Sequence, residues 1–170
     1  TTWGDLSVWN GRAVDYSWYD GKSSPYTIST AAQFAAFGNI LNKADGRDDR
    51  FTNKTIYLAA DLNMSCKPFR AMGGHIKGQE FAGTFEGDGH IIKNLNINEL
   101  GYEGSTCAAL FACIRDAKVR NLGLECVSIG VSGAKYQGAL VGYVLGDIPC
   151  TIENCFVRDV KMNLTLPIGE

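Results

Sequence analysis

The two histidines are the first residues to consider for chemistry, because imidazole is a common metal ligand and acid–base group near neutral pH. His75 and His90 each precede an isoleucine in separate polar stretches. The chain has no His-Glu-x-x-His motif, and no third ligand is spaced to join the two histidines. A Gly-x-Ser-x-Gly nucleophile elbow is also missing. We therefore predict no catalytic residue, no metal site and no cofactor.

Charged residues recur at one position of an internal repeat and could form a row on one face. The row is Lys93, Arg120 and Glu153, and three aspartates near turns accompany it: Asp116, Asp147 and Asp159. A polysaccharide lyase needs a basic residue near carboxylates, and a glycoside hydrolase needs two carboxylates about 5 to 10 Å apart. A solvated face with weak ion pairs explains the same row. We favour a protein that is not an enzyme, because no convergent site is visible.

Aromatic residues crowd the start of the chain and could bind sugars by stacking. Trp9, Trp18 and Tyr19 are the candidate ligand-binding residues, with Trp3 and Tyr16 beside them. Large aromatics are also buried when a segment has few other apolar residues. Packing of the N-terminal segment against the rest of the protein is the favoured interpretation.

Three stretches of the chain repeat one pattern, residues 81–97, 107–124 and 137–157. Each has an apolar strand, a polar turn and a second strand containing Asn94, Asn121 or Asn154. Imperfect repeats of this length without helical periodicity are typical of a solenoid of strands. Alignment on the asparagines predicts three buried ladders. They are Ile92 with Val119 and Ile152; Leu95 with Leu122 and Cys155; and Ile97 with Leu124 and Val157.

Asparagine recurs where a strand must bend, since it tolerates the left-handed backbone region. The helical spacing of Phe34, Phe37, Ile40 and Leu41 predicts one helix, with Ser29 or Thr30 as its N-cap. This helix is expected to cover the first coil. The organisation is then an aromatic-rich segment (1–25), a strand plus capping helix (26–53), and coils (54–170) expected to continue beyond residue 170.

Composition restricts the partners. The net charge of −2 and the lack of a basic run argue against nucleic acid. The apolar runs are too short for a membrane-spanning helix. A first residue of Thr1 indicates a mature or excised fragment without its targeting signal. The six cysteines lack a Cys-x-x-Cys pair and are favoured as free core thiols, although Cys107 with Cys113, or Cys150 with Cys155, could bridge in a secreted protein.

The run FAGTFEGDGHIIKNLNI resembles a signature of β-helical bacterial surface proteins, and QGALVG is similar to their GLUG motif. The order of WNGRAVDYSWYDG, YTISTAAQFAAF, TIYLAADLNMS and PFRAMGG also resembles the segment that precedes those repeats. Ala112 replaces the expected glycine, and Glu86 stands where aspartate is usual. Such repeats occur in adhesin-like surface proteins and beside IgA-cleaving metalloproteases.

The sequence therefore predicts an all-β fold, a right-handed parallel β-helix (solenoid) of three to four coils with one N-terminal capping α-helix. The resemblance implies a non-catalytic structural or adhesive module of a secreted or surface-anchored bacterial protein, located outside the cell or on its surface. Glycans or host surface proteins are the expected partners, together with self-association through an open C-terminal coil. The alternative is a fragment of a polysaccharide lyase or glycoside hydrolase with a β-helix fold.

Overall fold

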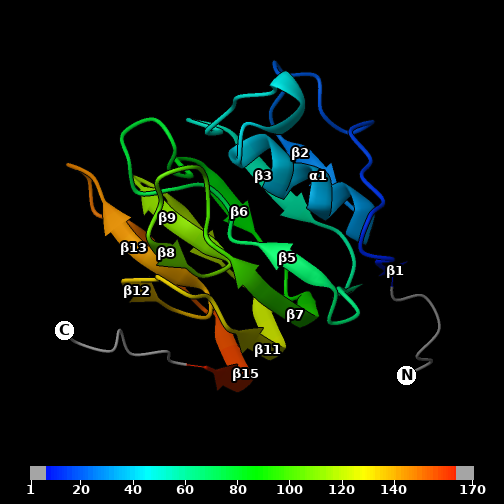
Figure 1. Cartoon of the computed structure of the whole chain (residues 1–170). Helices are drawn as coiled ribbons and strands as arrows, with labels where there is room; N and C mark the ends of the chain where they lie inside the picture. Colours follow the sequence, from blue (N-terminus) through cyan, green and yellow to red (C-terminus); the bar gives the residue numbers. More distant parts are fainter. Residues whose placement is uncertain (1–6, 164–170) are drawn as a thin grey trace.

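A computed structural model describes residues 7–163 of the chain (Figure 1). Residues 1–6 and 164–170, and with them Trp3 and the ends of the predicted first and last segments, lie outside the described part. The elements in chain order are β1 (Ser7–Val8), β2 (Tyr26–Ile28), α1 (Ala31–Leu41), a 3-10 turn η1 (Ala44–Gly46), β3 (Thr55–Leu58), β4 (Leu62–Asn63), β5 (Pro68–Arg70), β6 (Thr84–Glu86), β7 (Ile91–Glu99), β8 (Cys107–Ala108), β9 (Phe111–Arg115), β10 (Lys118–Arg120), β11 (Gly123–Ile129), β12 (Tyr136–Gln137), β13 (Val141–Leu145), β14 (Thr151–Glu153) and β15 (Phe156–Met162).

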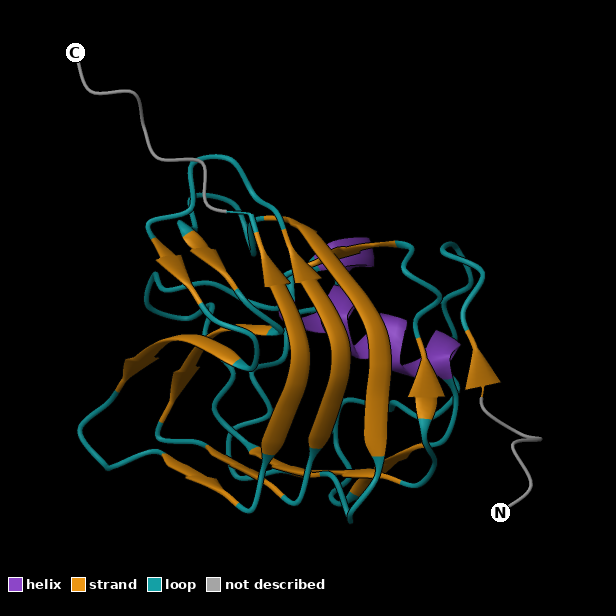
Figure 2. Cartoon of the chain, turned by 90° about the horizontal axis from the view of Figure 1, so that it is seen from below, coloured by secondary structure: helices purple, strands orange, loops and turns teal. Residues whose placement is uncertain are grey.

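The strands form four parallel sheets, and long connections separate the strands that pair. One sheet follows the order β1-β4-β7-β11-β15, with β5 also paired to β7. A second follows the order β14-β10-β6-β3-β2, and β12-β8 and β13-β9 are two-stranded sheets. Figure 2 shows the long strands of the first sheet side by side, with α1 on their far side. Neighbouring strands therefore come from successive copies of the repeat.

Residues with left-handed backbone conformation set the bends in these strands. Asn94 (φ 57°), Cys126 (φ 54°) and Asp159 (φ 57°) each interrupt a long strand at the same point of its register. A second kind of bend lies where the chain passes from one large sheet to the other. Asn121 (φ 54°) occupies it between β10 and β11, and Asn154 (φ 50°) between β14 and β15. The predicted role of asparagine at bends is therefore correct, because its short polar side chain tolerates this region.

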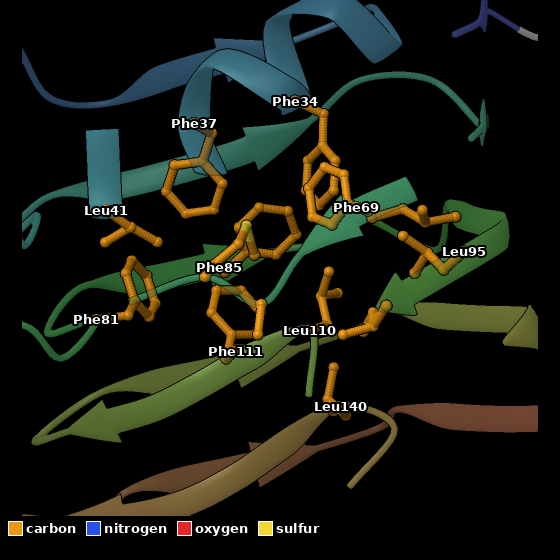
Figure 3. Packing of buried hydrophobic residues seen from close by; sticks show 14 of the residues in the cluster. Phe34, Phe37, Leu41, Phe69, Phe81, Phe85, Leu95, Leu110, Phe111 and Leu140 are labelled. Atoms are coloured by element: carbon orange, nitrogen blue, oxygen red, sulfur yellow. The ribbon is translucent and has the colours of Figure 1, made fainter. Parts of the chain in front are cut away.

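The helix α1 is part of the core. Thr30, one of the two predicted N-caps, accepts a hydrogen bond from the Gln33 amide. Phe34 stacks on Phe69 at 5.9 Å between ring centroids, and Phe37 stacks on Phe85 at 5.6 Å. Figure 3 shows these rings pointing from the helix into a cluster that the sheets share. The predicted inward face, Phe34 and Phe37, is completely buried.

The predicted all-β, right-handed parallel β-helix (solenoid) of three to four coils with a capping helix is wrong. The described residues form a mixed α/β fold of four parallel sheets and one α-helix. The strands are also too uneven for uniform coils, since β7 has nine residues and β6 only three. The prediction failed because it derived the whole fold from the repeated strands and gave the helix only a capping role. In the structure, the phenylalanines of α1 are part of the core.

The predicted pairing of the second repeat with the third is correct and that of the first repeat is wrong, and the third repeat is not buried as predicted, since Ile152 and Val157 are 47% and 37% exposed. Val119 pairs with Ile152, and Leu124 pairs with Val157. However, Ile92 pairs with Leu124, while Phe85 is the partner of Val119. The alignment failed because the two asparagines are not equivalent: Asn94 bends the middle of β7, whereas Asn121 lies at the bend between β10 and β11.

Candidate binding surface

Apolar side chains gather, exposed to solvent, on the last strands of the described chain. Ile152 in β14 is 47% exposed, and in β15 Val157, Val160 and Met162 are 37 to 40% exposed. Val144 in β13 is 50% exposed. We call these five residues the apolar edge. Scattered apolar residues on a surface need no explanation, but these five lie on the last described strands of three sheets, and an exposed apolar patch is typical of an interaction site.

Each member of the apolar edge is the last residue of a buried row. Ile152 follows Tyr26, Ile56, Phe85 and Val119, which are 0 to 3% exposed. Val160 follows Val127 and Leu95, and Met162 follows Ile129 and Ile97, all at most 1% exposed. The inward face of the core therefore continues to this edge and then meets water.

The backbone of the same strands is also open on one side. Within residues 7–163, β15 pairs only with β11, β14 only with β10, and β13 only with β9. A strand at a sheet edge presents unpaired N–H and C=O groups that can pair with another chain. A hollow of about 360 Å³ lies beside β13, where residues 144–150 turn towards β14. The edge thus offers both apolar side chains and backbone hydrogen-bonding groups.

The opposite end of the molecule is closed. The side chains of Tyr26 and Ile28 in β2 are buried, and α1 lies against this part of the core. In Figure 1, α1 and β2 lie at one end, and β13 and β15 at the other. Within residues 7–163, one end of the core is therefore covered by α1 and the other end is open.

Sequence reasoning named no residue of the apolar edge as a binding residue. The pattern of β14 and β15 is the same as in the buried strands: Ile152-Glu153 matches Val119-Arg120 in alternation. The exposed strands differ from the buried ones only in lacking a second strand partner within residues 7–163, and the residue pattern does not indicate this difference. The expectation of an open C-terminal layer was the one available indication.

The buried carboxylates lie in ion pairs. The Glu80 side chain is completely buried and receives hydrogen bonds from Arg115 Nε at 2.7 Å and from the Gly78 amide, with Arg50 3.1 Å away. Burial acts to raise the pKa of Glu80, but these donors and the two guanidinium charges outweigh it and hold the pKa below its ordinary value.

Glu86 shows the same balance on another sheet. Burial acts to raise the pKa of Glu86. Hydrogen bonds from Asn121, the Asp88 amide and Arg120 lower it by more, so the net pKa lies below the ordinary value. A glycoside hydrolase instead needs one carboxyl group whose pKa is raised, so that it stays protonated. Glu80 and Glu86 are therefore suited to holding strands together rather than to donating a proton.

The histidines lie apart from these carboxylates. His90 Nδ1 is 3.0 Å from Asp61 Oδ1, in a half-exposed pair that joins two turns. His75 accepts a long hydrogen bond from the Thr106 amide. Among residues 7–163, no group of three His, Cys, Asp or Glu side chains is arranged to hold a metal ion.

The predicted charged row is divided by the structure. Arg120 and Glu153 occupy neighbouring strands, with 3.8 Å between Nη1 of Arg120 and Oε1 of Glu153. Lys93 pairs in register with Glu125, in the other large sheet. The three residues therefore form no common site.

The N-terminal aromatic candidates pack against the core. Trp9 is 7% exposed, donates from Nε1 to the Ala13 carbonyl and contacts Phe69 edge to face. Trp18 and Tyr19 are half-buried around Phe51. Because much of the surface of these rings is buried against other protein residues, the packing interpretation explains them without a ligand. Their predicted binding role stays a prediction.

A different aromatic pair is more accessible. Tyr136 in β12 is 41% exposed, and its ring lies 4.7 Å from that of Tyr143 in β13. The His75 ring lies 6.5 Å from Tyr143. This pair borders the apolar edge through β13. Tyr136 directly precedes the third repeat and Tyr143 lies in its first strand, but the prediction concentrated on the aromatic-rich N-terminus.

All six cysteines are free. Cys107 and Cys113 are buried as predicted, and Cys150 and Cys155 are half-buried. Cys66 and Cys126 are exposed. The predicted core location is therefore wrong for Cys66 and Cys126; Cys126 occupies the left-handed bend between Glu125 and Val127.

Comparisons with protein-family models, with curated proteins and with solved structures find no match to this chain. The resemblance to GLUG-type surface proteins therefore stays a prediction. Within residues 7–163, no helix has the length and apolar character needed to cross a membrane.

Proposed function

We propose that this chain is a non-catalytic structural module that binds a further polypeptide along its open β-edge. The observation that carries the proposal is the apolar edge: rows that are at most 3% exposed in the inner strands end in residues that are 37 to 50% exposed. Adding parallel strands to β14 and β15 would cover these residues and pair the free backbone groups. An adhesive or scaffold role in a secreted or surface-anchored bacterial protein is consistent with this mode of binding.

The energetic argument favours docking of strands over docking of a small ligand. Covering an apolar side chain is worth roughly 25 cal/mol per Å² of apolar surface. The edge is long and the hollow beside β13 is open to solvent, whereas small-molecule sites are enclosed and concave. Five apolar side chains on three strands therefore fit a partner that is itself extended.

The experiment uses the whole chain with an added strand layer. A second copy of residues 118–130, which contain β10 and β11, is appended through a Gly/Ser connection. Counted from β15, this connection matches in length residues 130–150, which join β11 to β14. Tethering of this kind supplies an effective concentration on the order of millimolar. Amide hydrogen exchange of β15 is the measurement.

In the matched control, the appended copies of Val119, Leu124, Val127 and Ile129 are replaced by serine. We expect the apolar fusion to slow exchange in β15 by about tenfold or more relative to this control, because paired amides exchange only on local opening. Equal exchange rates in the two fusions would show that the edge does not accept a strand.

Glycan binding is a second candidate function, supported by the exposed pair Tyr136 and Tyr143. Planar rings at a surface can stack on sugar faces. A glycan array tests this with Tyr136→Ala and, as the control, Tyr57→Ala, since Tyr57 is similarly exposed at 38% but has no ring partner among the described residues. Loss of a signal in the first variant alone supports the site, and an array without any signal removes this candidate.

A further inference from the structure

Charged side chains on the outward face alternate in sign from strand to strand. In the second sheet, Glu86, Arg120 and Glu153 are neighbours in register on β6, β10 and β14. Arg120 Nε lies 2.6 Å from Glu86 Oε2, and Nη1 lies 3.8 Å from Glu153 Oε1. Arg120 therefore lies between two anions, and Glu153 has a cation on only one of its sides.

The first sheet shows the opposite phase. Lys93, Glu125 and Arg158 are neighbours in register on β7, β11 and β15. Arg158 forms an ion pair with Glu125, and its side chain is 62% exposed. The last strand of this sheet thus ends on a cation, while the last strand of the other sheet ends on an anion.

Side-chain amides add a third row between these two. Asn154 Nδ2 donates to Asn121 Oδ1 at 2.6 Å, and Asn121 Nδ2 donates to Glu86 Oε1 at 2.8 Å. Every donor in the row points back towards the earlier strand. The oxygen of Asn154 is consequently the group that a further layer could use, by donating from an amide of its own.

We propose that the open edge is specific for a parallel strand pair of defined charge, with a base opposite Glu153 and an acid opposite Arg158. An asparagine would stand on Asn154, and apolar residues would cover Ile152, Val157 and Val160. This inference rests on the proposed function and adds the sequence rule of the partner. Opposite charges on directly paired residues stabilise a sheet, and like charges destabilise it.

A second copy of this chain does not satisfy the rule in a parallel arrangement. Stacking β14 and β15 on themselves in register would place Glu153 on Glu153 and Arg158 on Arg158. The closed end of another copy does not fit either, because α1 and the buried side chains of β2 cover its core. The partner assigned here is a polypeptide segment with a different sequence from β14 and β15, and antiparallel pairing of two copies is an outcome of the test below.

Residues 118–130 satisfy the rule and serve as the probe. Stacked on the edge, their Arg120 faces Glu153, their Asn121 faces Asn154 and their Glu125 faces Arg158. The swapped probe carries Arg120→Glu and Glu125→Arg in the appended copy only, so its composition and net charge are unchanged. Two more fusions join the swapped probe and the matched probe to the chain carrying Glu153→Arg and Arg158→Glu.

We expect the matched probe to protect β15 amides about tenfold more than the swapped probe at low salt, because two cross-strand pairs change from opposite to like charge. The chain with Glu153→Arg and Arg158→Glu should reverse this order. High salt should shrink both differences, since the charges are exposed.

The outcomes separate the two proposals. Equal protection by the matched and swapped probes overturns the charge rule and leaves strand docking intact. Protection by neither probe beyond the serine control overturns strand docking itself. Sedimentation equilibrium of the unfused chain tests whether a second copy occupies the edge instead. A dimer with protected β15 amides would show this and overturn the inference.

Discussion

Replacing Glu80 by glutamine tests whether a buried ion pair holds the N-terminal part of the chain to the repeat strands. Glu80 lies between Arg50, which precedes β3, and Arg115, at the end of β9. The carboxylate accepts a hydrogen bond from Arg115 and forms an ion pair with Arg50, and Arg50 also donates to the Glu80 carbonyl. Glutamine keeps the shape of the side chain but turns one acceptor into a donor. That NH₂ group must then face an arginine.

The expected cost follows from burial. The Glu80 side chain is completely buried, while those of Arg50 and Arg115 are 30% and 25% exposed. Breaking a fully buried pair costs about 3 to 5 kcal/mol. Because both arginines can turn partly to water, we expect Glu80→Gln to lower the free energy of unfolding by about 2 to 3 kcal/mol. Glu103→Gln, at an exposed site, is the matched control and should change it by less than about 0.5 kcal/mol.

The pH dependence gives a second check. The pKa of Glu80 lies below its ordinary value of 4.5 in the folded protein. A carboxyl with a lowered pKa contributes stability above its unfolded pKa and loses it as the pH falls through the folded pKa. The difference between the two proteins should therefore be constant near neutral pH and should close as the pH falls below 4.5.

Urea unfolding followed by tryptophan fluorescence measures both effects. A variant that unfolds within about 0.5 kcal/mol of the parent at neutral pH would refute the ion-pair argument. A loss of stability that does not diminish in acid would assign the cost to packing rather than to charge.

Three more outcomes are expected from packing and backbone geometry. Phe37→Ala should cost about 3 to 5 kcal/mol in urea unfolding, because its ring is completely buried among other rings. Gly83→Ala should be clearly less stable than Gly130→Ala, since a Cβ on Gly83 would lie 2.5 Å from the Phe51 carbonyl oxygen and one on Gly130 only meets a side chain at 3.5 Å. A thiol reagent should modify Cys126 in the folded protein and Cys113 only after unfolding, because burial raises the pKa of Cys113 to about 12.

The helix was predictable from local signals. The Thr30 cap and the spacing of Phe34 and Phe37 are properties of a short stretch, and both the start and the inward face of α1 follow from them. Its role in the core was not predictable in the same way. Phe37 meets Phe85 and Phe111, which are far away in the chain, and no local pattern encodes these contacts.

The repeat was recognised, but its register was only partly predictable. Asn94 and Asn121 share a residue type because each bend needs a left-handed residue, and the two bends are different. Cysteine and aspartate fill the bend of Asn94 in the next two strands, so residue identity does not mark it. The correct match of Val119 to Phe85 requires aligning Asn121 with Gly87, a different residue type at the equivalent bend.

The charges on the open strands explain how an apolar edge can persist in water. Natural proteins protect sheet edges with charged side chains, especially lysine, that hinder indiscriminate pairing. On β15, Asp159 and Lys161 flank Val160 and Arg158 precedes them, so two cations and one anion interrupt the apolar edge. A neutral or basic strand that approached β15 would gain apolar contact but meet these charges, whereas an acidic one would gain both. The same residues thus disfavour aggregation and select the partner, and removing them should broaden binding rather than abolish it.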